Sequence, residues 1–298
     1  MSFSSQVKAE LCRGEISRRC CAVAESCGIL LYANSFTMSE ARIVTESAEF
    51  ASRLPSLFQE AFSVGFDLLP EAESDGKKIF RILSGEKLAA IWHTLGYDRS
   101  QHFALHLNFA LLEEEHCRSA FLRGAFLAGG SVTDPQKRYH LELSTPHLQV
   151  AGETEALLRD MSLEPKRIMR KSNAVLYFKS SSGIEDLLTL MGAGECAASF
   201  RSAKKAKQVR NVANRRVNCD EANLNKAVDA SRAQVAALTR LTESGIISTL
   251  PVGLQEVAVA RLLQPELTLS ELAASFDPPL TKSCLNHRMR KLMQLAQE

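Results

Sequence analysis

The sequence lacks the short motifs that mark several large enzyme classes. It contains no glycine-rich phosphate loop and no G-x-S-x-G nucleophile turn, which argues against a P-loop nucleotide hydrolase and a serine hydrolase of that type. No uninterrupted apolar run approaches the roughly 20 residues of a membrane span, and no hydrophobic signal segment is present. We therefore expect a cytoplasmic protein that does not enter a membrane.

Zinc-finger spacing is also missing, because none of the eight cysteines forms a CxxC pair. Reduced thiols are expected in a chain without a signal segment. Cys20, Cys21 and Cys27 fall in an apolar stretch with helical character, and we interpret them as small core residues rather than zinc ligands. The sequence therefore predicts no metal site and no cofactor.

Charge is unevenly distributed along the chain, although the net charge is only +2. The chain has 298 residues, of which 45% are hydrophobic, so it is long enough for two domains. Residues 1–105 and 106–195 each carry a net charge of −2, and residues 220–298 carry −1. Residues 196–219 carry +7 and contain no acidic residue. The basic residues of this connector are Arg201, Lys204, Lys205, Lys207, Arg210, Arg215 and Arg216.

Such a concentration of positive charge is typical of a protein that binds a polyanion, because each neutralised phosphate releases condensed counterions. The alternative is a solvated linker that only keeps the chain soluble. A second basic segment near the C-terminus, residues 280–298 with a net charge of +3, favours nucleic acid.

The C-terminal segment has the pattern of two short helices joined by a proline turn. Thr268 followed by Glu271 predicts a capping box and a helix that starts at Leu269. Pro278 and Pro279 cannot continue that helix, which is expected to end near Phe276. Its apolar face is formed by Leu269, Leu272, Ala273 and Phe276.

The second helix is expected over Lys282–Ala296, with an apolar face of Leu285, Met289, Leu292 and Ala296. Its other face is basic and polar. This layout is typical of a helix-turn-helix that reads double-stranded DNA, with Lys282, Asn286 and Arg290 directed at base edges. The other candidate contacts are Thr281, Ser283, His287, Arg288 and Lys291. A charged face that is merely solvated is the alternative. Helices over Glu221–Glu243 and Gly253–Leu263 complete an all-α domain at 220–298.

The first 195 residues show a repeat of nearly one hundred residues. Residues 1–105 read as helix, two strands, helix, two strands and helix, and residues 106–195 repeat this order. A strand pair is expected near Gly65–Leu69 and Lys77–Leu83 in the first copy. The fold class is therefore α+β, a duplicated αββαββα unit followed by the all-α domain.

Gly28 and Gly124 interrupt the first long helix of each repeat at the same place. A glycine within a helix costs about 1 kcal/mol relative to alanine. Its recurrence predicts a close approach of two helix backbones.

The stretch FLRGAFLAGGSV, at 121–132, resembles the helix motif of LAGLIDADG homing endonucleases. Together with CCAVAES, RNVANRRVNCDEANLNK and DPPLTKSCLNHRMRKL, it makes the chain similar to the WhiA family over essentially its whole length. The resemblance implies a LAGLIDADG-like domain at 1–195, a basic connector at 196–219 and a helix-turn-helix domain at 220–298. It also implies a nucleoid-associated transcriptional regulator of cell division, chromosome segregation and, in spore formers, sporulation.

The endonuclease motif ends in an acidic residue in each repeat, and the paired acids hold divalent cations for phosphodiester hydrolysis. Alignment on Gly28 and Gly124 puts Ala33 and Gly129 at those positions, and the nearest acids are Glu40 and Asp134. We therefore expect a regulator that is not an enzyme. The alternatives are a division protein whose first domain binds other regulators or division proteins, with secondary DNA binding, and a metal-dependent endonuclease.

Overall fold

The structure is a computed structural model that describes residues 2–70, 76–98 and 104–297. The chain forms two compact units, Met1–Gln208 and Val209–Glu298, which are described separately. Among the described residues, no helix combines the length and the apolar character needed to cross a bilayer.

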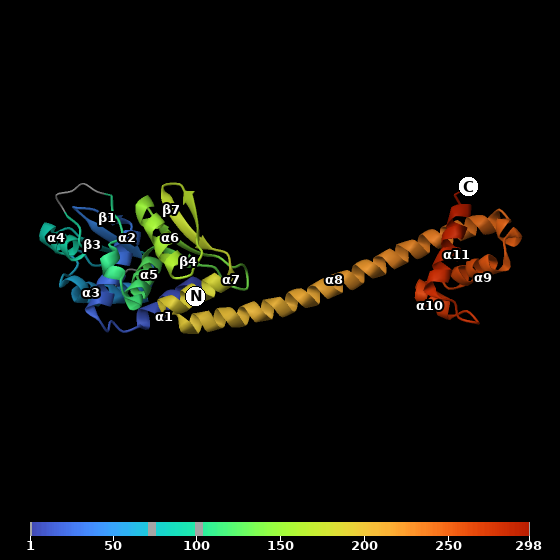
Figure 1. Ribbon diagram of the computed structural model, residues 1–298, viewed down its shortest axis with the longest axis horizontal. Coiled ribbons are helices and arrows are strands. Elements are labelled where there is room, and N and C mark those ends of the chain that lie inside the picture. The colour runs from blue at the N-terminus through green and yellow to red at the C-terminus, as the bar shows by residue number, and fades with distance from the viewer. Residues whose placement is uncertain (1, 71–75, 99–103, 298) are drawn as a thin grey trace. The chain divides into compact units, whose positions relative to one another are not determined.

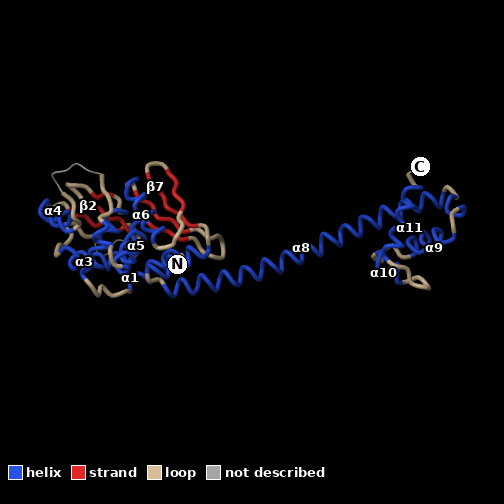
Figure 2. Tube along the Cα trace, in the orientation of Figure 1, coloured by secondary structure: helices blue, strands red, loops and turns tan. Residues whose placement is uncertain are grey.

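The first repeat of the N-terminal unit contains a three-stranded antiparallel sheet in the order β1-β2-β3 (Figures 1 and 2). Residues alternate between buried and half-buried along β2, so one sheet face packs on the core. Its elements are α1 (Phe3–Arg13), α2 (Arg19–Tyr32), β1 (Ser35–Phe36), β2 (Ala41–Thr45), α3 (Ala48–Phe62), β3 (Lys78–Ile82) and α4 (Gly85–Thr94).

The second repeat has a four-stranded antiparallel sheet in the order β4-β5-β7-β6. It has the predicted order of helices and strands, and β5 shows the same alternating burial as β2. Its elements are η1 (Phe109–Leu112), α5 (Glu115–Gly129), β4 (Gly130–Val132), β5 (Leu141–Thr145), α6 (Leu148–Asp160), β6 (Lys166–Arg170), β7 (Asn173–Phe178) and α7 (Ser181–Met191).

One predicted strand of the first repeat is wrong. Residues 65–69 do not form a strand, and only a single bridge joins Leu68 to Arg81 on β3. Pro70 follows directly and has no N–H to donate, so the ladder cannot continue beyond this bridge. The segment still occupies the sheet edge that β6 occupies in the second repeat.

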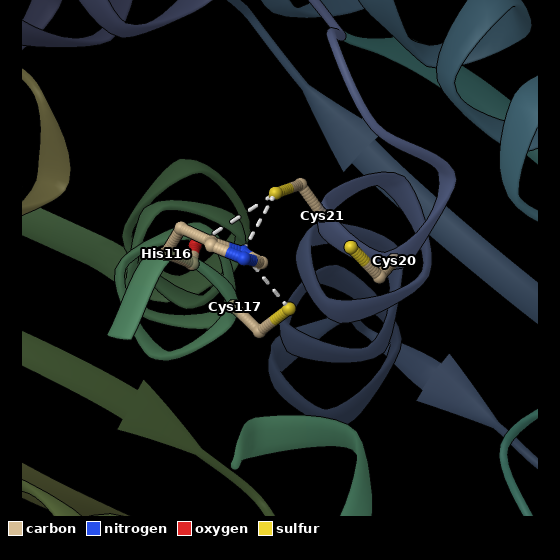
Figure 3. A group of neighbouring side chains, drawn as sticks. All are labelled: Cys20, Cys21, His116 and Cys117. Carbon is tan, nitrogen blue, oxygen red and sulfur yellow. Dashed lines mark hydrogen bonds between the residues drawn. The ribbon is translucent and has the colours of Figure 1, made fainter. Parts of the chain in front are cut away.

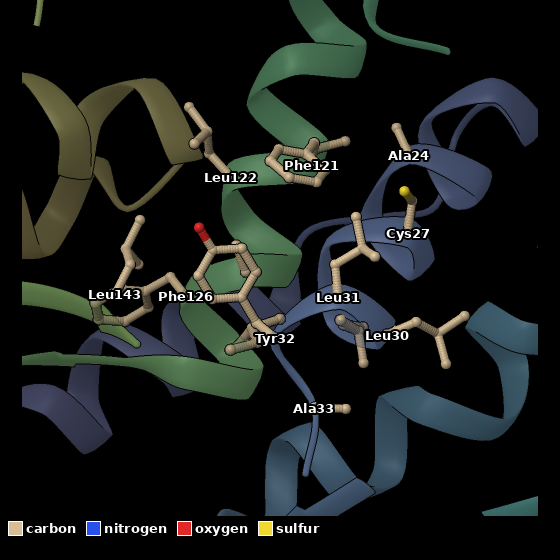
Figure 4. Packing of buried hydrophobic residues seen from close by; sticks show 14 of the residues in the cluster. Ala24, Cys27, Leu30, Leu31, Tyr32, Ala33, Phe121, Leu122, Phe126 and Leu143 are labelled. Atoms are coloured by element: carbon tan, nitrogen blue, oxygen red, sulfur yellow. The ribbon is translucent and has the colours of Figure 1, made fainter. Parts of the chain in front are cut away.

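Helices α2 and α5 pack against each other at the two mid-helix glycines. A Cβ atom on Gly28 would lie 2.2 Å from the Phe121 carbonyl oxygen, and one on Gly124 would lie 2.0 Å from the Glu25 carbonyl oxygen. The predicted close approach of the two backbones is confirmed. Figure 4 shows the apolar side chains around this helix pair, among them Leu31 and Tyr32.

The C-terminal unit is all-helical, as predicted. It comprises the later part of α8 (Gly194–Glu243), η2 (Ile246–Thr249), α9 (Val252–Leu263), α10 (Leu269–Ala274) and α11 (Lys282–Leu295). Helix α10 ends two residues before the predicted Phe276, where the Ser275 hydroxyl donates to the Leu272 carbonyl oxygen at 2.8 Å. The core contains Leu238, Leu241, Leu254, Val257, Ala258, Leu272, Ala273, Leu285, Met289 and Leu292.

Candidate nucleic-acid interface

Helix α11 presents a buried apolar face and an exposed polar face. Leu285, Met289 and Leu292 are buried against α9 and α10, as their spacing predicted. The opposite face offers the groups expected to reach DNA. Lys282, Ser283, His287, Arg290 and Lys291 are exposed and Asn286 is half-buried.

The starts of α10 and α11 are set by side-chain caps. The predicted capping box is present: the Thr268 N–H donates to Glu271 Oε2 at 2.8 Å, and the Glu271 N–H donates to Thr268 Oγ1 at 3.3 Å. The first of these bonds lowers the pKa of Glu271. Thr281, predicted as a DNA contact, accepts the Cys284 N–H at 3.2 Å and caps α11. Its hydroxyl therefore helps to fix where the helix starts.

Arg288 lies against α9 rather than projecting freely. It is half-buried, and its Nη1 donates to the Gly253 carbonyl oxygen at 3.3 Å. A Cβ on Gly253 would lie 3.2 Å from the same nitrogen, so the guanidinium lies directly over a residue without a side chain. The helical wheel of α11 alone could not reveal this contact, because Gly253 is 35 residues away in sequence.

The basic connector is helical and forms part of α8. Two of its cations bind the N-terminal unit. Arg201 forms an ion pair with Glu185, and Lys207 Nζ donates to the Lys137 carbonyl oxygen at 2.9 Å and lies 4.8 Å from the Tyr139 ring centroid. Phe200 is fully buried in the same unit. These contacts dock the start of α8, a role that charge counting missed.

The remaining cations of the connector are more accessible. Lys204 is half-buried and Lys205 is exposed in the N-terminal unit. Arg210, Arg215 and Arg216, in the C-terminal unit, are exposed, and within the described ranges the structure shows no ion pair for them. Their guanidinium groups are therefore accessible to a phosphate backbone.

The acidic positions of the endonuclease motif do not fit divalent cations here. Ala33 has no ligand atom, and a Cβ on Gly129 would lie 2.3 Å from the Ser144 carbonyl oxygen, so no side chain fits there without rearrangement. The nearest acids have other partners. Arg81 Nε donates to Glu40 at 2.7 Å, and Asp134 Oδ1 accepts the Gln136 N–H at 2.8 Å.

A cluster of possible metal ligands lies instead at the N-terminal ends of α2 and α5. Cys20, Cys21, His116 and Cys117 place one ligand atom each within 4.8 Å of all the others. The sequence interpretation of Cys20 as a core residue is wrong, because Cys20 is exposed in the first turn of α2. Cys21 is half-buried and packs against the edge of the core. Cys27 is buried, as expected.

Burial raises the pKa of the Cys117 thiol to about 12 and also raises that of Cys21. Both thiols are therefore protonated at neutral pH unless a cation is present. This argues against a reactive nucleophilic cysteine at this place.

Comparison with known proteins gives a family match for each of the two units. Residues 118–210 match the family model of the WhiA LAGLIDADG-like domain, and residues 213–296 match that of the WhiA C-terminal HTH domain. The fold is similar to that of full-length WhiA from Thermatoga maritima, with a TM-score of 0.59 and 24% identity, covering 100% of this chain and 98% of that chain. The N-terminal LAGLIDADG domain of WhiA matches with a TM-score of 0.50 and 22% identity, over 64% of this chain and 92% of that chain.

Two bacterial relatives match over nearly their whole length. The chain is 35% identical over 305 residues to the probable cell division protein WhiA of Ruminiclostridium cellulolyticum, covering 100% of this chain and 97% of that protein. It is 36% identical over 304 residues to the corresponding protein of Desulforudis audaxviator, with the same coverage. The chain therefore belongs to the WhiA family.

Proposed function

We propose that this protein is a sequence-specific regulator that binds double-stranded DNA and acts in cell division. The observation that supports this most directly is the exposed basic face of α11, the second helix of a capped and packed helix-turn-helix. Its relatives carry the name probable cell division protein WhiA. We extend the proposal to transcription control, chromosome segregation and sporulation, and to a place at the nucleoid.

In this proposal α11 enters the major groove. Lys282, Asn286 and Arg290 contact base edges, where arginine pairs with guanine and asparagine with adenine. The exposed Ser283 and Lys291 contact phosphates and fix the register. Arg288 acts mainly by holding α11 against α9, through its bond to the Gly253 carbonyl oxygen.

We propose the functional division 1–195, 196–219 and 220–298 for scaffold, connector and DNA-binding domain. The scaffold performs no phosphodiester hydrolysis, because Ala33 and Gly129 supply no carboxylate pair. Its two repeats are each net acidic, which favours binding of other regulators or division proteins over a grip on DNA.

The first test is selection of binding sites from random duplex DNA by the intact protein, followed by titrations at several salt concentrations with Mg²⁺ present. The proposal expects enrichment of one site, a steep salt dependence and intact DNA. No preference for any duplex would contradict sequence-specific binding. Cleaved product would contradict the absence of nuclease activity.

Arg290→Ala is expected to weaken binding to the selected site by about 1 to 3 kcal/mol, because it removes a bidentate contact to a base. The measurement is fluorescence anisotropy on the selected duplex and on a scrambled one. Arg138→Ala, at an exposed arginine of the N-terminal unit, is the matched control and should bind as the unaltered protein does. An equal loss on both duplexes would instead make Arg290 a phosphate contact.

The double variant Arg215→Ala/Arg216→Ala is expected to reduce the slope of log K against log salt by about 2, one for each phosphate contact removed. Lys207→Ala removes the same type of charge from a side chain that already binds Lys137 and Tyr139. It should leave the slope nearly unchanged. If Lys207→Ala reduces the slope as much per charge as Arg215→Ala/Arg216→Ala does, the connector acts through its total charge and not through contacts of particular side chains.

A further inference from the structure

We propose that Cys20, Cys21, His116 and Cys117 bind one zinc ion that joins the two repeats at the N-terminal ends of α2 and α5. Figure 3 shows the four side chains facing a common space, two from each helix. The site lies within the N-terminal unit, at the ends of α2 and α5 opposite to the positions at which the endonuclease motif carries its acids.

The position of the ligands follows from the duplication of the fold. Cys21 lies seven residues before Gly28, and Cys117 lies seven residues before Gly124. Cys20 and His116 precede them by one residue. Because the two glycines let the helix backbones touch, residues two turns earlier on both helices are also brought together. The cluster is therefore a product of the same pseudo-twofold arrangement that forms the core.

The distances suit a tetrahedral zinc site. His116 Nδ1 lies 3.3 Å from Cys21 Sγ and 3.3 Å from Cys117 Sγ, and all four ligand atoms lie within 4.8 Å of one another. Around tetrahedral zinc, with bonds of about 2.0 to 2.3 Å, ligand atoms lie roughly 3.5 to 3.8 Å apart. Contraction of the longer separations by at most about 1 Å would therefore complete the site. Three cysteines and one histidine are also one of the closed donor sets of structural zinc.

The surroundings favour an anionic zinc-thiolate group. Three thiolates and a neutral imidazole give Zn²⁺ a net charge of −1, and the positive ends of the two helix dipoles meet there. Arg18 adds a nearby positive charge that acts on Cys21. A bound cation deprotonates a coordinating thiol directly, which overcomes the effect of burial on Cys117. Because Cys20 is exposed, an ion in solution can reach the cluster at this residue.

The place of the cluster indicates a structural role. Cys21 is twelve residues before Ala33, about 18 Å along a helix. The ion would therefore sit far from the positions of the endonuclease acids. It would tie two helices whose ligands are 95 residues apart in sequence, His116 and Cys21, and so stabilise the pairing of the repeats.

The experiment uses the full chain, purified under reducing conditions without chelators, and measures zinc per chain by plasma mass spectrometry. We expect one zinc ion per chain, lost in Cys21→Ser/Cys117→Ser and retained in Cys219→Ser, which alters an exposed thiol outside the cluster. Exchange with Co²⁺ should give the visible bands of a tetrahedral site with thiolate charge transfer. Removing zinc with a chelator should lower the unfolding midpoint reported by Trp92, the only tryptophan, and adding zinc should restore it.

His116→Cys provides a test that does not depend on the folding of a serine variant. It should retain one zinc ion and strengthen the thiolate charge-transfer bands of the Co²⁺ form, because the donor set changes from three sulfurs to four. Reduced protein that takes up no zinc, a Cys21–Cys117 disulfide, an iron–sulfur chromophore, or zinc retained by the double serine variant would each overturn the proposal.

Discussion

Replacing Glu25 with glutamine is expected to lower the free energy of unfolding of the N-terminal unit by about 3 to 5 kcal/mol, the cost of leaving buried charges without their partner. The Glu25 side chain is 2% exposed and binds two arginines. Arg53 donates to it from Nε at 2.7 Å and from Nη2 at 3.0 Å, and Arg123 donates from Nη1 at 3.2 Å.

The expected effect is large because Glu25 organises several segments. Arg53 also donates to the Cys12 carbonyl oxygen at 3.2 Å, just before the end of α1, and Arg123 Nε donates to the Met191 carbonyl oxygen at 2.9 Å at the end of α7. Glutamine keeps the shape and one acceptor but leaves the buried Arg53 and the half-buried Arg123 without a negative charge. Their desolvation is then no longer offset.

Urea denaturation followed by Trp92 fluorescence measures this loss in the N-terminal unit. Glu195→Gln is the matched control, since its pair with Arg13 spans 3.7 Å between side chains that are 83% and 73% exposed. Such surface pairs contribute about 0 to 1 kcal/mol. A loss below 1 kcal/mol for Glu25→Gln would show that the arginines find water or other acceptors.

Gly124→Ala is expected to destabilise the same unit by about 3 kcal/mol, at the upper end of the usual cost of overpacking. The new Cβ would lie 2.0 Å from the Glu25 carbonyl oxygen and 3.0 Å from the Ile29 nitrogen. Both are backbone atoms of α2, so relief requires the two helices to separate.

Gly85→Ala is the control, because Gly85 also lies in a helix and a Cβ there would meet nothing within 4 Å. The free energy of unfolding of the Gly85→Ala variant should be unchanged or slightly higher, since alanine favours helix more than glycine does. Both variants are compared in the same urea titration. Equal stability of the two would mean that α2 and α5 can move apart at little cost.

Predictions that depend on residues within a few positions of one another were confirmed, and a prediction that depends on a distant partner strand was wrong. The capping box at Thr268 and Glu271 was confirmed because both hydrogen bonds lie within one helical turn. The apolar face of α11 was confirmed because helical periodicity alone brings its members to one side. The strand at 65–69 was wrong because pairing needs continuous backbone partners on both sides of the Leu68–Arg81 bridge. Pro70 has no N–H on one side, and on the other side the Asp67 carboxylate accepts the Leu83 N–H in place of a backbone carbonyl.

The sequence by itself determined the duplicated α+β unit, the all-α unit that follows and the glycine contact between α2 and α5. Periodicity and caps depend on residues a few positions apart, and the recurring glycines show the same position in each repeat. Only the tertiary structure decided which contacts the charged and sulfur-containing side chains make. It placed Arg288 over Gly253, docked Lys207 on Tyr139 and joined Cys21 to His116 across 95 residues. These contacts depend on how helices pack in three dimensions. Of the three, only the cysteine cluster leaves a trace in residue spacing, because Cys21 and Cys117 each precede a contact glycine by seven residues.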